Sequence, residues 1–307
     1  MGKTVFLFSG QGSQYAGMGA ELCAALPEAK KIYDLASDTL GFDVLKLSRE
    51  GSDAELAKTG VSQPLIFTLS LAAFSAASAA GLRADACAGF SLGECTALTA
   101  SGAMSPETGF KVIRERAKAM QRAAEEKGGT MYAILGASAQ DVEEACAKAD
   151  GYAAPVNFNC PGQIVIAGEE AAATSSAQTL AASGAKTVRL AVNAAFHSRM
   201  MDGAAQDFYA VIKDMPFGRP SMTLYSNVSG EKYETDDIPS YLRRQMVSPV
   251  RFTDEMAAME KDSCDTFVEF GPGKTLCGFI RRGIRGARSM SVDNPAALEK
   301  CLETLLK

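Results

Sequence analysis

The pattern of apolar and polar positions predicts strands that alternate with helices in the first part of the chain. Residues 4–8 form a continuous apolar run, which is typical of a parallel strand buried on both faces. The uncharged stretch 64–82 is long enough to cross a membrane, but its serines, threonine and alanines favour a helix buried against a sheet. A helix is also predicted from Pro106 to about Lys127, because Ser105 can cap it and proline suits its first position.

This last helix has a cation within its apolar stripe. Ile113, Arg116, Ala117 and Met120 follow the i, i+3, i+4, i+7 spacing of one helix face, so Arg116 points inward. A buried guanidinium is costly unless an anion meets it. The periodicity leaves open whether that anion is a protein carboxylate or a substrate.

From Gly128 the pattern changes to short strands and two helices. The predicted strands are 130–135, 154–158, 163–167 and 186–192, and the predicted helices are 139–148 and 171–182. The order βαββαβ is that of a ferredoxin-like unit. We therefore expect an α/β protein in which a ferredoxin-like domain, 128–193, is inserted into a larger α/β domain with a parallel sheet, formed by 1–127 and 194–307.

The remaining elements are predicted from shorter signals. A helix is expected near 18–26 and another ends near 243–245, with strands at 222–227 and 265–270. After the second strand, the turn Gly271-Pro272-Gly273 leads into a short helix.

The sequence Gly89-Phe90-Ser91-Leu92-Gly93 lies between a short apolar strand and a helix. Gly-x-Ser-x-Gly in this context is the pattern of a nucleophile elbow, in which a sharp turn exposes the serine and side chains at the glycines would collide with neighbouring backbone. A simple turn between strand and helix is the alternative.

The loop Ser9-Gly10-Gln11-Gly12 follows the first strand. It is not a dinucleotide fingerprint, because Tyr15 occupies the place of the third glycine. Its backbone N–H groups could instead face a developing negative oxygen, although a tight turn explains the glycines equally well.

His197 is the only histidine of the chain and lies in another predicted loop between a strand and a helix. A lone histidine is most often a packing or surface residue. A serine nucleophile, however, needs a base with a pKa near neutrality, and no other imidazole is present.

Composition excludes several classes of function. The 307 residues are 47% hydrophobic, and the net charge of −5 argues against a nucleic-acid partner. The eight cysteines are scattered without a C-x-x-C pair or a histidine-rich partner segment, so we predict no metal site, and no cofactor is expected. With no secretory signal, these thiols indicate a cytoplasmic protein.

Several stretches together resemble the acyltransferase family that includes the malonyl-CoA:acyl carrier protein transacylases of fatty-acid synthesis and the acyltransferase domains of polyketide synthases. The stretches are 8–14, 89–94, 116–121, 156–159 with 161–163, 195–198, 244–245 with 248–250, and 269–274. The resemblance covers nearly the whole chain. It implies a hydrolase-like large domain with an inserted ferredoxin-like one, as the periodicity also predicts.

The resemblance further implies transfer of a malonyl group from malonyl-CoA to the phosphopantetheine thiol of acyl carrier protein, in a ping-pong reaction through a malonyl-serine. Ser91 matches the nucleophile of the family and His197 matches its base. The backbone N–H groups of Gln11 and Leu92 match the oxyanion hole.

Three further positions match residues that orient the substrate or the base. Arg116 matches the residue that holds the free carboxylate of malonate. The backbone carbonyl of Gln245 matches the group that steadies the histidine, and Phe196 matches an aromatic residue associated with malonyl rather than branched units. Phe90 departs from the family, which usually has histidine before the serine.

Two other functions stay open at this point. An esterase or thioesterase would use the same serine and histidine, but its acyl pocket should be apolar throughout. A catalytically silent module that binds acyl carrier protein would use the arginines between 281 and 288, whose ordinary explanation is a solvated basic face. The sequence does not distinguish a carrier protein of fatty-acid synthesis from one of polyketide synthesis.

Overall fold

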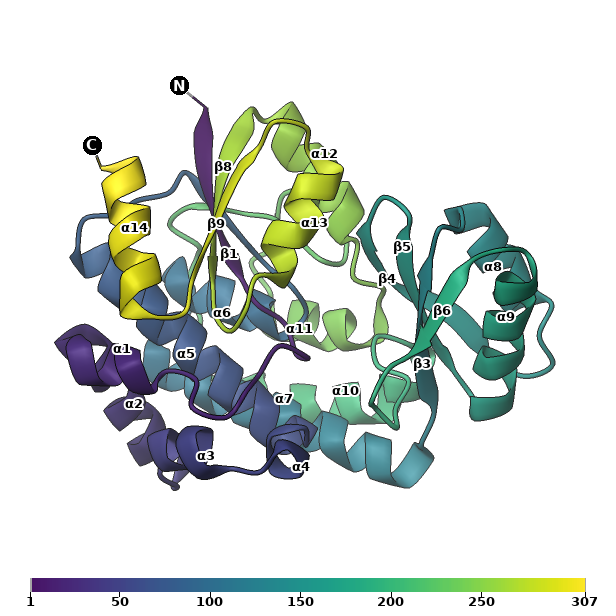
Figure 1. The fold of residues 1–307 in the computed structure, drawn as a ribbon. Coiled ribbons are helices and arrows are strands. Elements are labelled where there is room, and N and C mark those ends of the chain that lie inside the picture. The colour runs from purple at the N-terminus through teal and green to yellow at the C-terminus, as the bar shows by residue number, and fades with distance from the viewer. Residues whose placement is uncertain (1, 307) are drawn as a thin grey trace.

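A computed structural model describes residues 2–306, which form two sheets with helices around them (Figure 1). The larger sheet is entirely parallel, in the order β7-β2-β1-β8-β9. Its strands are β1 (Lys3–Phe8), β2 (Ala86–Gly89), β7 (Thr223–Leu224), β8 (Cys264–Phe270) and β9 (Arg288–Val292). The predicted fold class, a parallel sheet with a second and smaller unit, is confirmed.

The central strand β1 explains why its sequence is continuously apolar. Phe6 and Phe8 belong to one hydrophobic cluster, whereas Val5 and Leu7 belong to another on the opposite face of the sheet. Successive side chains of a strand point to opposite faces, so both faces of this sheet are covered.

Helices cover both faces of the large sheet, and most helices of the protein lie around it. They are α1 (Ala20–Ala25), α2 (Pro27–Leu40), α3 (Val44–Glu50), α4 (Asp53–Leu56), α5 (Thr59–Ala79), α6 (Leu92–Ala100), α7 (Pro106–Lys127), the 3₁₀ turn η1 (Arg199–Met201), α10 (Asp202–Ile212), α11 (Ile238–Val247), α12 (Phe252–Lys261), α13 (Thr275–Gly283) and α14 (Pro295–Leu305). Ser105 caps α7 by accepting a hydrogen bond from the Thr108 N–H, as its sequence predicts.

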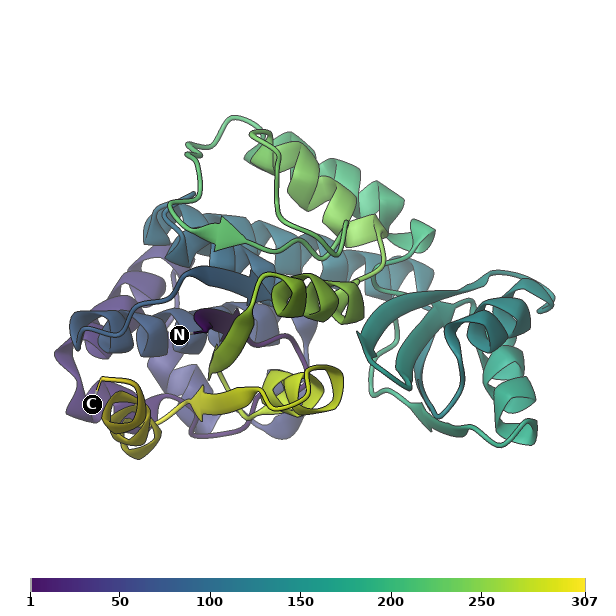
Figure 2. The same ribbon diagram turned by 90° about the horizontal axis from the view of Figure 1, so that it is seen from above.

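The smaller sheet lies beside the larger one, as the view from above shows (Figure 2). Its chain order is β3 (Thr130–Leu135), α8 (Ala139–Ala147), β4 (Ala153–Cys160), β5 (Gln163–Gly168), α9 (Glu170–Ala182) and β6 (Lys186–Arg189). The strands are antiparallel in the order β4-β5-β3-β6. The βαββαβ order is therefore confirmed, while the division into domains at 128 and 193 stays a prediction.

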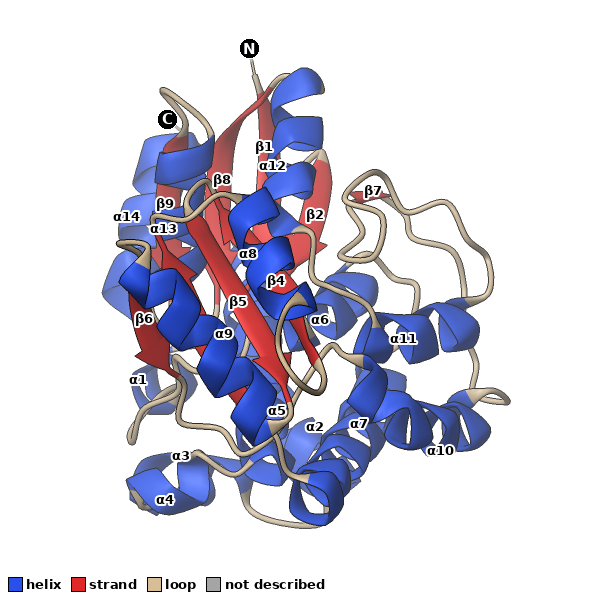
Figure 3. Cartoon of the chain, turned by 90° about the vertical axis from the view of Figure 1, so that its right-hand side faces the viewer, coloured by secondary structure: helices blue, strands red, loops and turns tan. Residues whose placement is uncertain are grey.

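One face of this small sheet packs on its own helices, which lie in front of it in Figure 3. Ile134, Ile164 and Ile166 pack there with residues of α8 and α9. The alternate residues Met131 and Ala133 belong to the cluster of the large unit. The second face of the small sheet thus turns towards the larger sheet.

Several predicted boundaries are wrong. The strand predicted at 186–192 ends at Arg189, because Leu190 and Val192 turn to pack against the main core. The strand predicted at 222–227 is shorter in the structure, where β7 comprises only Thr223–Leu224 and Tyr225 turns to an isolated bridge with Lys232. The helix predicted from residue 18 starts at Ala20, after Gly19 in a left-handed conformation with φ 79°.

The uncharged helix α5 begins at Thr59, before Pro64. By length and composition it is the one helix among residues 2–306 that could cross a membrane, but 78% of its apolar window is buried inside the protein. This burial agrees with a core helix. All eight cysteines are buried and free, and no cluster of three or more potential metal ligands occurs among residues 2–306.

Candidate active site

The candidate site lies at the carboxyl edge of the parallel sheet, where the loops after β1 and β2 meet. Ser91 follows β2 and directly precedes α6, with φ 55° and ψ −107°. These angles are uncommon for a residue with a side chain and indicate a strained turn. The predicted elbow is therefore present, and it places the serine at the N-terminus of a helix.

Both glycines of the elbow are required by space. A Cβ atom on Gly89 would lie 2.0 Å from the backbone carbon of Gly93. A Cβ atom on Gly93 would lie 2.1 Å from the carbonyl oxygen of Phe8 in the neighbouring strand. Strand, turn and helix can approach this closely only without side chains at these positions.

Gly93→Ala is expected to lower the free energy of unfolding by about 3 kcal/mol, because the backbone of β1 must move to admit the methyl group. Gly278→Ala in α13 is the matched control, since a Cβ atom there meets nothing within 4 Å. Its effect should stay below about 1 kcal/mol. Denaturant unfolding of both variants measures the difference, and equal effects would contradict this account of the elbow.

His197 meets the serine from a different part of the chain. Its Nε2 lies 2.7 Å from Ser91 Oγ, and its Nδ1 lies 3.0 Å from the backbone carbonyl oxygen of Gln245. A carbonyl can only accept, so Nδ1 carries the proton of the neutral ring and Nε2 is free to accept the serine proton. The ring is buried, with only 4% of the residue exposed.

The environment of His197 favours its neutral form. Burial, and secondarily the positive charge of Arg116, lower the pKa of His197 from 6.5 to about 4. The imidazole can therefore act as a base throughout the neutral range.

The rate of any acylation of Ser91 should depend on pH accordingly. It should be constant from neutral pH down to roughly 5 and should fall as the pH passes below about 4, where the base becomes protonated. The unfolded chain binds this proton already near 6.5, so stability also falls as the pH drops from 6.5 towards 4. Single-turnover rates, taken only where circular dichroism is unchanged, provide the measurement. An inflection near 6.5 would disagree with this expectation.

Arg116 of α7 is completely buried beside the serine. Its Nη2 donates to Ser91 Oγ at 3.1 Å and to Gln245 Oε1 at 3.0 Å, and its Nη1 donates to Gln63 Oε1 at 2.8 Å. All three acceptors are uncharged, and Nε has no hydrogen-bond partner among residues 2–306. Helix periodicity left open whether Arg116 meets a protein carboxylate or a substrate. Within residues 2–306, no carboxylate is hydrogen-bonded to Arg116.

The acidic residue Glu94 is connected to Arg116 through the side chain of Gln245. The side-chain amide of Gln245 lies between the two charges, because it donates to Glu94 Oε2 at 3.0 Å and accepts from Arg116. A buried cation without a direct counterion next to a serine hydroxyl favours a negatively charged ligand.

Of the predicted site residues, four line a cleft of about 370 Å³, whereas Leu92, Arg116 and Gln245 do not. Gln11, Phe196, Ser91 and His197 line it from the large unit, while Met131, Asn157 and Leu190 line it from the small unit or from the segment just after it. The segment that was predicted as the end of a strand, at 190–192, is thus part of the cleft wall.

Gln11 lies in the loop after β1, and Leu92 is the first residue of α6, directly after the serine. No hydrogen bond within residues 2–306 uses the backbone N–H of either residue. The Gln11 side chain donates to Thr59 Oγ1 and accepts from Gln63 Nε2, which fixes the loop. Both N–H groups are therefore free to donate a hydrogen bond to a bound oxygen.

Phe90, which departs from the family pattern, is part of an aromatic group. Its ring centroid lies 5.7 Å from that of Phe252 and 6.1 Å from that of Phe279. Phe90 also lines the cleft. The ring therefore forms an apolar wall beside the serine, where a histidine would be a polar one.

Four contributors to the site were missed from the sequence: Gln63, Glu94, Asn227 and Glu255. Asn227 accepts a hydrogen bond from the Ser91 N–H at 2.8 Å. It is the last residue of the strand predicted at 222–227, and polar residues at the carboxyl ends of strands in α/β sheets commonly face a site, so this signal could have been used. For Glu94 and Glu255, no local pattern indicates the partner.

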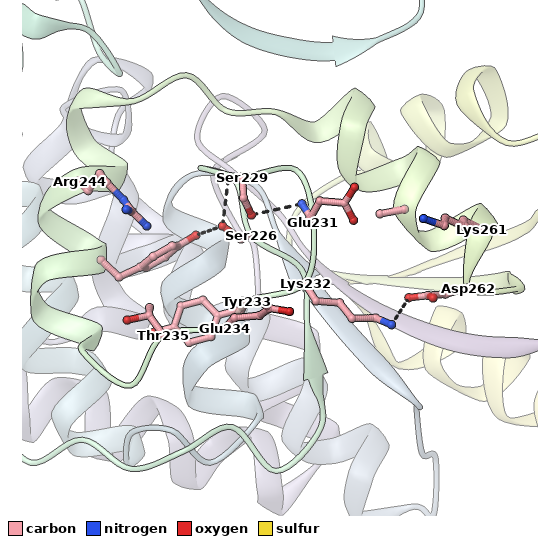
Figure 4. A pocket seen from close by; sticks show the side chains of 12 residues that line it. Ser226, Ser229, Glu231, Lys232, Tyr233, Glu234, Thr235, Arg244, Lys261 and Asp262 are labelled. Atoms are coloured by element: carbon pink, nitrogen blue, oxygen red, sulfur yellow. Dashed lines mark hydrogen bonds and ion pairs between the residues drawn. The ribbon is translucent and has the colours of Figure 1, made fainter.

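A second cavity of about 570 Å³ is lined by the segment after β7 and by residues of α11 and α12 (Figure 4). Its wall includes Ser226 and Tyr241, whose hydroxyl groups are 2.7 Å apart. The Tyr241 hydroxyl also donates to Glu94 Oε1. This hydrogen-bonded chain connects the wall of the cavity with the helix that begins at the elbow.

Comparisons with known proteins agree with this geometry. The family model described as acyl transferase domain matches residues 5–298. A malonyl CoA-acyl carrier protein transacylase of Bacillus subtilis is 36% identical, covering 99% of this chain and 98% of the relative, and one of Escherichia coli is 35% identical, covering 99% and 100%.

Solved structures give the same result. A malonyl CoA-acyl carrier protein transacylase of Clostridium perfringens is 36% identical, with a TM-score of 0.95 and coverage of 99% of this chain and 97% of that chain. A malonyl-transacylase solved in complex with a type II PKS acyl-carrier protein is 33% identical, with a TM-score of 0.94 and coverage of 98% and 99%. The resemblance indicated by the sequence motifs is confirmed: the chain belongs to the acyl transferase domain family.

Proposed function

We propose that this protein transfers a malonyl group from malonyl-CoA to the phosphopantetheine thiol of an acyl carrier protein. The observation that carries the proposal is the convergence of three groups, because Ser91 Oγ lies within hydrogen-bond distance of both His197 Nε2 and Arg116 Nη2. A serine with a base could serve any esterase. The buried guanidinium of Arg116 favours an acyl group that carries a negative charge.

The first half of the reaction forms a malonyl ester. His197 Nε2 takes the proton of Ser91 as Oγ attacks the thioester carbonyl carbon, and the resulting oxyanion accepts hydrogen bonds from the N–H groups of Gln11 and Leu92. The carbon–sulfur bond then breaks, and the CoA sulfur leaves with the proton from His197. Arg116 binds the free carboxylate of the malonyl group through paired hydrogen bonds.

The second half reverses these steps with another thiol. His197 takes the proton of the phosphopantetheine thiol, whose sulfur attacks the ester carbonyl, and the proton returns to Ser91 as its oxygen leaves. The Gln245 carbonyl keeps Nδ1 protonated in both halves. Phe196 borders the acyl group and limits its branching.

The relatives in Bacillus subtilis and Escherichia coli are named as transacylases of an acyl carrier protein, which supports such a carrier as the partner of this chain. The complex with a type II PKS acyl-carrier protein suggests a second type of carrier for such folds. We propose fatty-acid synthesis and a cytoplasmic location for this chain. The eight free, buried cysteines are compatible with that compartment.

Intact mass spectrometry tests the proposal directly. After mixing with malonyl-CoA, the protein should gain one malonyl group, and addition of the phosphopantetheine form of acyl carrier protein should remove it and give the malonylated carrier. Absence of the adduct would overturn the proposal. An adduct that only water removes would indicate a thioesterase instead.

The exposed arginines of α13 give a prediction about the carrier. Arg281 and Arg282 are exposed, and an acidic carrier would meet positive charge there. The double variant Arg281→Glu with Arg282→Glu should raise the KM for the carrier about tenfold and leave acylation by malonyl-CoA unchanged. Steady-state kinetics with varied carrier measures this effect. An unchanged KM would remove α13 from the docking surface.

A further inference from the structure

Asn227 lies where β7 has just ended, next to the strand that leads into the elbow, and is completely buried. Its side chain spans the turn that carries the serine. Oδ1 accepts a hydrogen bond from the Ser91 N–H at 2.8 Å, and Nδ2 donates one to the Gly89 carbonyl oxygen at 2.6 Å. One side chain therefore satisfies a backbone group on each side of Phe90.

The orientation of this amide is fixed by its neighbours. The second hydrogen of Nδ2 is donated to Glu255 Oε1 at 2.8 Å, so both donor positions are used. If the amide were reversed, its NH₂ group would face the Ser91 N–H and its oxygen would face the Gly89 carbonyl. Only the observed orientation satisfies the Ser91 N–H and the Gly89 carbonyl. A side chain with an acceptor and a donor in the positions of the asparagine amide is needed to bond both groups.

Asn227 is also joined to the residues that hold the base. Its backbone N–H donates to Glu94 Oε1 at 2.9 Å, and Glu94 Oε2 accepts from Gln245 Nε2 at 3.0 Å. Gln245 Nε2 donates as well to the Ser91 carbonyl oxygen at 2.7 Å, while the Gln245 backbone carbonyl bonds His197. The same buried network therefore contacts the nucleophile and the group that orients its base.

The strained backbone conformation of Ser91 must be stabilised by contacts with the surrounding residues. An uncommon backbone conformation such as that of Ser91 persists only where surrounding contacts determine it. We propose that Asn227 is a positioning residue for the acyl transfer: its side-chain amide holds the elbow in the conformation in which the Ser91 hydroxyl reaches His197. This role rests on the proposed function only in so far as Ser91 is the nucleophile.

Asn227→Leu removes both elbow contacts and keeps the number and branching of the side-chain heavy atoms. Acylation of Ser91 by malonyl-CoA should become about 100-fold slower in single turnover, because a small displacement of a reacting atom has an effect of this size. The KM for malonyl-CoA should change by less than about threefold, since Asn227 does not line the cleft. A purely structural role would lower stability without this separation of rate from KM.

Asn227→Asp is the second variant and keeps the shape of the side chain. It retains an acceptor for the Ser91 N–H, but its other oxygen cannot donate to Gly89 or Glu255, so acylation should be at least about tenfold slower. If Asn227→Leu does not fold, Asn227→Asp alone tests the positioning role of this residue. Asn159→Leu is the matched control, because Asn159 is also buried and lies outside the cleft lining and the elbow network.

Labelling of Ser91 by phenylmethylsulfonyl fluoride separates this inference from the proposed function. The reagent reports the reactivity of the serine with its base and needs no malonyl substrate. Slower labelling in both Asn227 variants, with Asn159→Leu like the wild type, supports the positioning role even if the wild type accepts no malonyl group. Labelling and acylation at the wild-type rate in a folded Asn227 variant would overturn it.

Discussion

Ser91→Ala is expected to abolish the malonyl adduct of this protein. The variant should show no mass gain with malonyl-CoA and should lose transfer activity on the order of 10⁴-fold or more, because the covalent route depends on one hydroxyl. The structure leaves no substitute, since Ser91 Oγ is the hydroxyl that both His197 and Arg116 contact. Intact mass spectrometry and a carrier-malonylation assay provide the measurements.

The control for this variant is Ser70→Ala. Ser70 is also a buried serine, on α5, and its hydroxyl has no hydrogen-bond partner among residues 2–306. It should form the adduct like the wild type. An adduct that persists in Ser91→Ala would place the acyl group on another residue and would contradict the proposed mechanism.

Arg116→Ala is expected to remove the preference for a malonyl group. Without the guanidinium, the free carboxylate of the substrate would be buried and unpaired, so acylation by malonyl-CoA should fall about 10²- to 10³-fold. Acylation by acetyl-CoA should fall much less. The measured quantity is the ratio of kcat/KM for the two thioesters, because loss of the Arg116 contact to Ser91 Oγ affects both alike.

Arg114→Ala is the matched control, since Arg114 is an exposed cation on the same helix and bonds to Glu115 and to the Thr39 carbonyl. It should leave the ratio unchanged. A malonyl preference that survives in Arg116→Ala would require another group to bind the carboxylate and would return the esterase alternative to consideration.

The parts of the fold that were predicted correctly have signals that are local in the sequence. Ser105 and Pro106 mark the start of α7, and Gly89 and Gly93 mark the elbow, because capping and close backbone approach each depend on a few adjacent residues. The small unit was predicted because each of its strands and helices shows its own periodicity.

Errors occurred where packing outweighs local preference. Leu190 and Val192 have strand-like sequence, but after one more hydrogen bond to β3, from the Leu190 N–H to the Met131 carbonyl, the chain turns and both side chains pack against the main core beside the cleft. Pro64 would ordinarily mark the start of a helix, yet α5 begins earlier, at Thr59, and Thr59, Ser62 and Gln63 of this added turn are buried against other elements.

For the site, the sequence alone predicts three groups that the structure brings together: a serine on a glycine turn, the only histidine, and an arginine on an apolar helix face. Each is recognisable from its immediate neighbours. The three-dimensional structure is needed to see that Arg116 has no direct carboxylate partner within residues 2–306 and that Asn227 and Gln245 join the segment of Ser91 to that of His197. These contacts join residues far apart in the chain, and a side-chain hydrogen bond leaves no period or spacing in the sequence from which it could be predicted.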